Sequence, residues 1–323
     1  MNIKKDKNMN FAPIIIPTLN RCDHLKACLE SLNNNHNAEN TEVFVSVDYP
    51  PSEKYIEGYK QVCNYLKNAQ FKFKAFTVYY QKHNLGIKGE NSNYRFLLNI
   101  VKKKYDRWIV SEDDNIFSPN FIDFLNKGLN KFENDKSVLS ICGYSFFYNL
   151  KFKDNNFFFQ HADYNAWGHA VWKSKFEKVL NCDVNYLRKI VFNPIKLIKI
   201  WRVSSQRVGN LLFLSYKKNY KIADNFYTLY MINEDMYQVM PKISKVRNMG
   251  WDSSGIHCIG FDEVIVKKHL TQKIDECDSF EYVGKGTEYL EKNQNIIKRE
   301  DFIQVDLLKL IVKLVIRYIL FWK

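Results

Sequence analysis

The sequence predicts an α/β protein in which a mostly parallel sheet carries helices on both faces. Short apolar segments alternate with amphipathic helical patterns four times within about the first 130 residues, which is typical of such a sheet. Polar residues follow several apolar segments where the predicted strands end, and in open α/β sheets these ends form a common ligand-binding edge. At 323 residues, 46% of them hydrophobic, the chain suits one large domain with extensions or two small ones.

Four strand–helix units justify this fold class in order. The predicted strands are 12–17, 43–47, 71–80 and 107–111. After each strand, apolar residues recur at the spacing of a helix face. These residues are Leu25, Cys28, Leu29 and Leu32; Ile56, Tyr59, Val62 and Leu66; Tyr94, Leu97, Leu98 and Val101; and Phe121, Phe124, Leu125, Leu129 and Phe132. Ser52 is expected to cap the second helix, and residues 83–89 are expected to form a loop before the third.

The acid cluster Glu112-Asp113-Asp114 follows the fourth predicted strand directly. Because side chains alternate along a strand, we expect Glu112 and Asp114 on one side and Asp113 on the other. Three adjacent carboxylates repel one another unless a cation compensates, and a divalent metal carrying a nucleotide diphosphate would do so. A solvated acidic turn that caps the next helix is the plainer alternative.

Beyond the fourth unit the pattern is less regular. The further strands expected are 138–142 and 157–160. In segment 166–172, two aromatic residues flank Gly168; they either stack on a sugar ring or pack in the core. Loop 249–257 contains two glycines and is suited to closing over a ligand. Its His257 is interpreted as a metal ligand, a phosphate contact or a structural residue.

Composition excludes several classes. The seven cysteines are scattered and form no CxxC pair, which argues against a disulfide framework or zinc site and favours a reducing cytosol. The absence of GxGxxG and GxxxxGK[ST] motifs disfavours a dinucleotide enzyme or P-loop NTPase. Residues 1–10 are polar and expected to be disordered, and they show no pattern of a signal peptide or membrane anchor.

The formal net charge of +13 predicts a polyanionic partner. No acidic residue occurs from Val184 to Ala223, where nine Lys and Arg residues are interleaved with apolar ones. We interpret this block as a membrane or lipid-phosphate contact; a solvated helix face is the alternative.

Residues 307–322 are almost wholly apolar apart from three bases. Lys309, Lys313 and Arg317 lie four residues apart, so a helix would gather them into one stripe. The segment suits a helix lying in the membrane interface better than a membrane span. Docking on the protein's own core or at a dimer contact is the alternative.

Five segments, in this order, resemble a known family. They are 13–21 (PIIIPTLNR), 46–48 (SVD), 93–95 (NYR), 111–115 (SEDDN) and 241–244 (PKIS). Together they resemble the GT-A nucleotide-sugar glycosyltransferases, specifically relatives of N-acetylglucosaminyltransferase I and its bacterial cousins. The resemblance extends from about Phe11 to about Val264.

The resemblance implies a set of nucleotide-sugar contacts at the strand ends. These are Thr18 and Arg21 at the diphosphate, Asp48 at the uracil edge, Asn93 where the animal enzyme has a uridine-contacting histidine, Glu112 at the donor sugar, Asp113 at the ribose, and His257 in the loop that orders on donor binding. Asp114 would ligate Mn²⁺ or Mg²⁺.

On the acceptor side, the resemblance makes Asp224 the catalytic base. The competing carboxylates are Glu234, Asp235 and Asp262. Trp167 and Gly168 would line the acceptor site. The family often has Trp where Phe226 and His169 stand, so the acceptor is expected to differ.

The sequence therefore predicts a metal-dependent inverting glycosyltransferase. It would move a sugar from a UDP-sugar to a hydroxyl of a glycan or lipid-linked oligosaccharide in bacterial surface polysaccharide synthesis. The GT-A domain would cover 11–270, with a nucleotide-binding half of about 11–115 and an acceptor half of about 116–270. A C-terminal extension, 271–323, would follow.

We expect a cytoplasmic protein, peripheral at the inner face of the bacterial membrane. It would contact this anionic surface through the C-terminal helix and have no nucleic-acid partner. The alternative function is that of a non-catalytic basic protein that binds membrane or nucleic acid.

Overall fold

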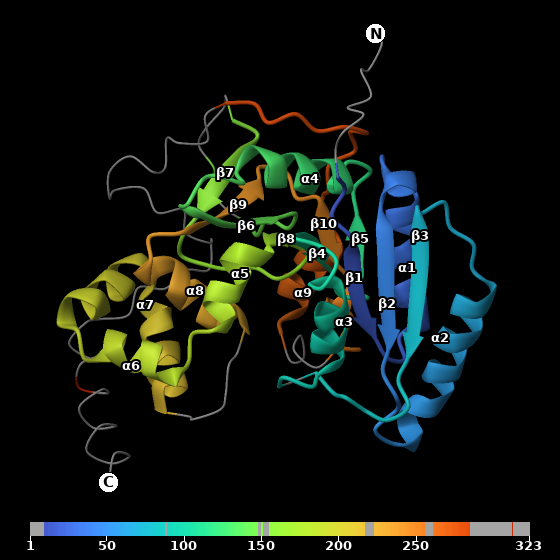
Figure 1. Cartoon of the computed structure of the whole chain (residues 1–323), viewed down its shortest axis with the longest axis horizontal. Coiled ribbons are helices and arrows are strands. Elements are labelled where there is room, and N and C mark those ends of the chain that lie inside the picture. Colours follow the sequence, from blue (N-terminus) through green and yellow to red (C-terminus); the bar gives the residue numbers. More distant parts are fainter. Residues whose placement is uncertain are drawn as a thin grey trace.

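The computed structural model describes residues 10–87, 89–147, 150, 155–216, 223–255, 261–284 and 312. Its centre is an eight-stranded sheet in the order β3-β2-β1-β4-β8-β6-β9-β7, covered by helices on both faces (Figure 1). The α/β fold class predicted from the alternating pattern is confirmed.

The first half of the sheet is parallel. Strand β1 (Ile14–Thr18) lies between β2 (Glu42–Val47) and β4 (Arg107–Val110), and β3 (Ala75–Tyr80) extends the sheet beyond β2. The carboxyl ends of these four strands therefore meet at one edge.

The second half of the sheet is mixed. Strand β8 (His169–Trp172) runs antiparallel to both β4 and β6 (Val138–Cys142). Strand β9 (Tyr237–Pro241) is parallel to β6 and antiparallel to β7 (Phe157–Gln160). A separate two-stranded sheet joins β5 (Asn115–Phe117) to β10 (Val246–Asn248).

The described helices cover the sheet in sequence order. The α-helices are α1 (Cys22–Asn33), α2 (Ile56–Asn68), α3 (Asn93–Val101), α4 (Phe121–Lys131), α5 (Lys173–Leu180), α6 (Val184–Val191), α7 (Pro194–Tyr216), α8 (Ala223–Asn233) and α9 (Glu263–Leu270). The short 3-10 helices are η1 (Ala38–Asn40), η2 (Glu53–Tyr55) and η3 (Gly250–Asp252). Helix α7 is interrupted at Ser204, whose backbone is not helical.

Two hydrophobic clusters pack on opposite faces of the sheet. On β1, Ile14 and Ile16 belong to the cluster that includes α1, α2 and α4, whereas Ile15 belongs to the cluster that includes α3 and α5 to α8. All three side chains are fully buried. The strand's alternation thus sends neighbouring residues into different layers, which explains its continuous apolar sequence.

Three local expectations differ from the structure. Strand β3 begins only at Ala75, because Phe71 and Phe73 stack with each other before it. Ser52 does not cap α2 with its side chain: its carbonyl accepts from Tyr55 N–H (3.1 Å) in the 3-10 turn that precedes the helix. Segment 166–172 was not expected as a strand, but its last four residues form β8.

Within the described part of the chain, no helix combines the length and apolar character needed to cross a bilayer. Residues 1–9 and, except for Val312, residues 307–322 lie outside the described ranges.

Candidate active site

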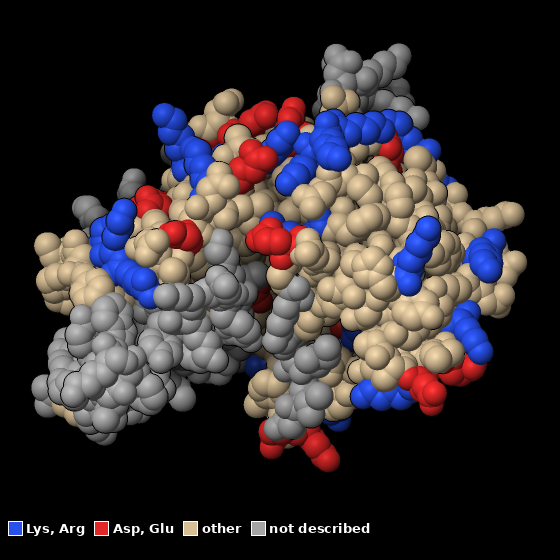
Figure 2. Space-filling view, turned by 60° about the horizontal axis from the view of Figure 1, so that its bottom comes forward, with Lys and Arg blue, Asp and Glu red and all other residues tan. Residues whose placement is uncertain are grey.

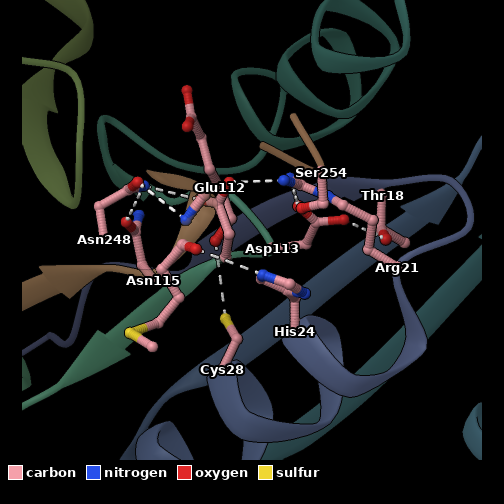
Figure 3. Close-up of polar contacts among 12 residues, drawn as sticks. Thr18, Arg21, His24, Cys28, Glu112, Asp113, Asn115, Asn248 and Ser254 are labelled. Atoms are coloured by element: carbon pink, nitrogen blue, oxygen red, sulfur yellow. Dashed lines mark hydrogen bonds and ion pairs between the residues drawn. The ribbon is translucent and has the colours of Figure 1, made fainter. Parts of the chain in front are cut away.

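The turn between β1 and α1 binds two members of the acid cluster. Thr18, at the end of β1, donates its hydroxyl to Asp113 Oδ2 (2.7 Å). Arg21, which directly precedes α1, forms an ion pair with Asp113 and places Nη1 2.8 Å from Asp114 Oδ2 (Figure 3). Both carboxylates are nearly buried. This juxtaposition confirms that the predicted strand ends meet.

The acid cluster is divided differently from the expectation. Asp113 and Asp114 share Arg21, whereas the Glu112 side chain is exposed and points away from it (Figure 3). The expected pairing of Glu112 with Asp114 was wrong because β4 ends at Val110, so the strand alternation no longer governs these residues.

Asp114 is fixed by a segment distant in the sequence. Asn248, the last residue of β10, donates its amide to Asp114 Oδ1 (2.8 Å), and Met249 N–H donates to the Asp114 carbonyl (2.7 Å). Gly250 lies so close that a Cβ at this position would overlap Asp114 Oδ2. The β5–β10 pairing therefore positions this carboxylate.

Arg21 also faces the loop after β10. Its Nη1 is buried without an aligned hydrogen-bond acceptor among the described residues, although Asp114 is close enough for ion pairing. A Cβ on Gly255 would lie 3.4 Å from this nitrogen. The guanidinium thus retains N–H capacity beneath the glycine loop, which suits an anionic ligand.

His24 connects α1 to the same loop. Its Nε2 lies 3.1 Å from Asp252 Oδ2 and 3.4 Å from the Met249 carbonyl. The loop is therefore fixed from two sides, by the acid cluster and by the first turn of α1.

The cluster carries more negative charge than Arg21 can balance. Burial, followed by the neighbouring charges of Asp114 and Asp224, raises the pKa of Glu112 well above its usual value. Burial also raises the pKa of Asp114, although Arg21 opposes that rise. These directions indicate a site that gains from additional positive charge.

Asp224, at the start of α8, faces the acid cluster from the other half of the protein. Its side chain reaches solvent, yet the surrounding protein desolvates it and raises its pKa to about 6. Arg207 opposes this rise and Asp163 adds to it. Because the charge of Asp224 acts on Glu112, both groups lie within electrostatic reach of one another. Figure 2 shows acidic side chains at the recess between the two parts of the molecule.

Arg207 joins three elements beside Asp224. It forms an ion pair with Asp163 and donates to the Asn225 carboxamide, next in sequence to Asp224. Asn210 donates to the same oxygen (2.9 Å). These contacts fix the start of α8 against α7.

The three competing carboxylates have structural partners. Glu234 accepts from the Tyr186 hydroxyl (2.8 Å), and Asp235 forms an ion pair with Lys199 (2.7 Å). The Asp262 carboxylate caps α9 by accepting from Val264 N–H (2.8 Å). Their positions favour Asp224 as the base.

Asp48 organises the loop after β3. Its carboxylate accepts from the N–H groups of Tyr49 (2.9 Å), Leu85 (2.8 Å) and Gly86 (2.8 Å), and from the Asn84 amide (3.2 Å). These bonds occupy most of its acceptor capacity. Contact of Asp48 with a uracil edge stays a prediction.

Asn93 does not face open space as the resemblance implied. It is buried, and its amide donates to the carbonyls of Ser46 (2.9 Å) and Thr18 (3.3 Å). The shorter Asn side chain is used to tie α3 to β1 and β2, which corrects its expected nucleotide contact.

The predicted acceptor residues have different surroundings. Trp167 is half-buried and packs edge-on against Tyr144 and Trp251, so it joins the core to the glycine loop. Gly168 has φ +66°, and a Cβ there would press on Phe121 and Val246. Core packing explains Gly168, and acceptor contact stays a prediction for Trp167. His257 lies outside the described residues.

Sequence reasoning missed four residues that shape the site: His24, Arg207, Asn248 and Gly250. His24 could have been suspected, since it is one helical turn beyond Arg21. Asn248 and Gly250 stand beside the recognised glycine loop. Arg207 lies in a long basic block that offers no local signal for its partner Asp163.

The residues present fit a divalent cation bound together with a ligand. Among the described residues, no three His, Cys, Asp or Glu side chains gather into a complete metal site. A hard cation bound through one or two carboxylates and substrate phosphates needs no such group. The excess negative charge described above supports this fit, with Asp114 as the ligand.

Comparison with known proteins supports the family resemblance. The model of the GNT-I family matches residues 1–154, the part that includes Arg21 and the acid cluster. No curated protein sequence gives a significant match.

Three solved glycosyltransferases illustrate the structural likeness. Staphylococcus aureus TarS has 14% identity and a TM-score of 0.33, over 52% of this chain and 29% of that one. The Pyrobaculum calidifontis mannosyltransferase, solved with GDP-mannose and Mn²⁺, has 11% and 0.39, over 82% and 63%. Mouse xyloside xylosyltransferase 1 has 11% and 0.36, over 70% and 83%. The chain thus spans less than two thirds of the first two proteins.

The family match, the mixed sheet and the acid cluster at its parallel edge agree with the resemblance seen in the sequence. This chain is a glycosyltransferase of the GT-A nucleotide-sugar class, and its first 154 residues are similar to the GNT-I family.

Proposed function

We propose that this enzyme is a metal-dependent inverting transferase that uses a UDP-sugar. The observation that carries the proposal is the position of Asp224 across the recess from Glu112, while Asp113, Asp114 and Arg21 lie together at the nucleotide edge. The acceptor would be a hydroxyl of a glycan or lipid-linked oligosaccharide in bacterial surface polysaccharide synthesis.

Asp224 would accept the proton of the acceptor hydroxyl. With a pKa of about 6 it is mostly ionised at neutral pH, yet it remains basic enough to take a proton during attack. The acceptor oxygen forms a bond to the anomeric carbon from the side opposite the diphosphate. The bond from that carbon to the diphosphate oxygen breaks, and UDP leaves with its electron pair.

The nucleotide side would bind and orient the donor. Arg21 offers an N–H toward the diphosphate, and Glu112 reaches toward the donor sugar. Asp114 would hold Mn²⁺ or Mg²⁺, which when bound would neutralise charge on the leaving diphosphate.

Thermal unfolding of the full chain tests the donor assignment. UDP with Mn²⁺ is expected to raise the midpoint, by mass action on the folded state, and a chelator should remove the increase. GDP serves as the matched nucleotide. Equal stabilisation with a chelator present would contradict metal dependence, and a preference for GDP would contradict the UDP assignment.

Stereochemistry tests the reaction class. Among nucleotide sugars, the true donor is the one whose metal-dependent hydrolysis is fastest, and NMR of the transfer product should show the opposite anomer. A retained anomer would contradict the role of Asp224 as the base.

The enzyme is further proposed to work at the inner face of the bacterial cytoplasmic membrane. Support comes from the acid-free basic segment 184–223 and from residues 307–322, where Lys309, Lys313 and Arg317 form a stripe on an otherwise apolar helix pattern.

A further inference from the structure

The corner between α6 and α7 exposes three large apolar side chains. Phe192, which ends α6, is 53% exposed. Ile195 and Ile198, on the first turns of α7, are 79% and 40% exposed. Exposed apolar residues scattered singly are ordinary, but three within seven positions form a local patch.

The corner is a built turn. The Asn193 carboxamide oxygen accepts from the N–H groups of Ile195 and Lys196, both at 3.1 Å, and thereby caps α7. The inner faces of both helices are satisfied, because Leu187, Ile190 and Ile200 are buried. The outward apolar side chains are therefore not needed to pack the two helices together.

Positive charge surrounds these side chains. Lys189 and Arg202 are exposed, and Lys196 is half-buried next to Ile195. Lys199 belongs to the same surface but is paired with Asp235. No acid occurs in the sequence from Val184 to Ala223, so the corner is basic as well as apolar.

Charge decides which partner fits. A second copy of the chain would bring this basic surface against itself. The segment 307–322 contributes only Lys309, Lys313 and Arg317 as charged residues, so docking it here would also oppose like charges. An anionic bilayer matches both properties, because its surface attracts bases and its interface accepts apolar side chains.

We propose that the α6–α7 corner, formed by Phe192, Ile195 and Ile198 with Lys189, Lys196 and Arg202, docks on an anionic membrane surface. The apolar side chains enter the headgroup region, and the bases contact lipid phosphates.

The location of the corner gives this docking a use. Figure 1 places α6 and α7 at the opposite end of the molecule from α1 and α2. Helix α7 packs against α8, whose first turn carries Asp224. Docking would thus bring the acceptor half to the membrane, where a lipid-linked acceptor is located. This consequence rests on the proposed function, whereas membrane binding itself can be measured without substrate.

Vesicle flotation of the full chain is the main test. Phosphatidylglycerol-containing and pure phosphatidylcholine vesicles are compared for wild type, Phe192→Ser/Ile195→Ser and Lys189→Gln/Lys196→Gln/Arg202→Gln. The triple variant should lose affinity on the order of 100-fold for anionic vesicles at low salt and little for neutral ones. The double variant should lose on the order of tenfold for both.

Matched controls carry the same substitutions elsewhere. Ile56→Ser/Val264→Ser removes apolar side chains that are 39% and 74% exposed, and Lys60→Gln/Lys67→Gln removes exposed bases of α2. Both should float like wild type. Metal-dependent UDP binding should survive in every variant, which separates failure of this proposal from failure of the donor assignment.

Hydrogen exchange provides the local readout. Anionic vesicles should slow exchange in 188–202 but not in 263–270. Flotation without protection of 188–202 would overturn the proposal, as would displacement of the protein by RNA. Protection of 188–202 without vesicles, lost on dilution or on deletion of 307–323, would instead identify a second copy or the C-terminal segment as the occupant.

Discussion

The two sides of the active site satisfy their polar groups in opposite ways. On the nucleotide side, Asp113 and Asp114 are nearly buried and bound by Thr18, Arg21 and Asn248. On the acceptor side, the carboxylates of Glu112 and Asp224 reach solvent, and both have raised pKa values. One side is organised before any ligand arrives, whereas the other keeps its reactive groups available.

This contrast separates binding from chemistry. Hydrogen-bonded carboxylates are fixed in position, which suits orientation of a donor. A desolvated carboxylate with free lone pairs can take a proton, which suits a base. Substitutions on the two sides should therefore affect different kinetic quantities.

The largest expected effect is on turnover. Asp224→Asn removes the proposed base and should lower kcat by roughly 100- to 10,000-fold, while the Kd for UDP with Mn²⁺ changes little. Asp235→Asn is the control, because this neighbouring carboxylate pairs with Lys199 at the protein surface. A variant that retains turnover would move the base to another residue and remove the contrast.

On the nucleotide side the effect should appear in binding. Asp114→Asn should weaken metal-dependent UDP binding by about 100-fold or more, since even loss of outer-shell partners costs about 10- to 100-fold in metal affinity. Calorimetry with UDP and Mn²⁺ measures this change, with Asp183→Asn at the exposed cap of α6 as the control. Unchanged binding in the folded variant would exclude Asp114 as the metal ligand.

Gly250→Ala tests how tightly the glycine loop packs on Asp114. The added methyl overlaps Asp114 Oδ2, so the carboxylate or loop must shift, and UDP binding should fall roughly tenfold, within the usual cost of overpacking. Gly209→Ala in α7 is matched, because a Cβ there meets nothing within 4 Å. It should leave binding intact. Equal behaviour of both variants would show that the loop adapts freely.

The smallest and most diagnostic effect is on pH dependence. The base must be deprotonated, so kcat/KM should rise with pH through a midpoint of about 6. Arg207 opposes the raised pKa of Asp224, so Arg207→Gln should move the midpoint upward. Asp163 adds to it, so Asp163→Asn should move the midpoint downward. Shifts of the same sign would show a structural effect on α8 rather than an electrostatic one.

Much of the parallel half could be predicted because its information is local. The apolar strands, the helix spacing and the acids at strand ends lie within a few residues of one another. Thr18, Arg21 and Asp113 meet because parallel strands end at a common edge. The division within the acid cluster could not be predicted, because it depends on where β4 stops.

The remaining site depends on contacts that are distant in sequence. Asn248 reaches Asp114 through the β5–β10 pairing, and Arg207 reaches Asp163 through the packing of α7. No local pattern encodes either pair. The low pattern regularity after residue 136 has the same origin, since β8 pairs with β4 and β6 in an antiparallel direction that breaks the strand–helix alternation.

The bond from Asn248 to Asp114 also fixes a schedule for synthesis of the protein. Strands β1 to β4 can pair early, but Asp114 acquires its amide partner only after residue 248 has been made. At about 5–20 residues per second, the ribosome needs roughly 7 to 27 seconds to cover that interval. A nascent chain therefore exposes an acid cluster that is still incomplete. Donor binding should begin only once most of the protein has emerged, so an unfinished enzyme is not expected to capture nucleotide sugar.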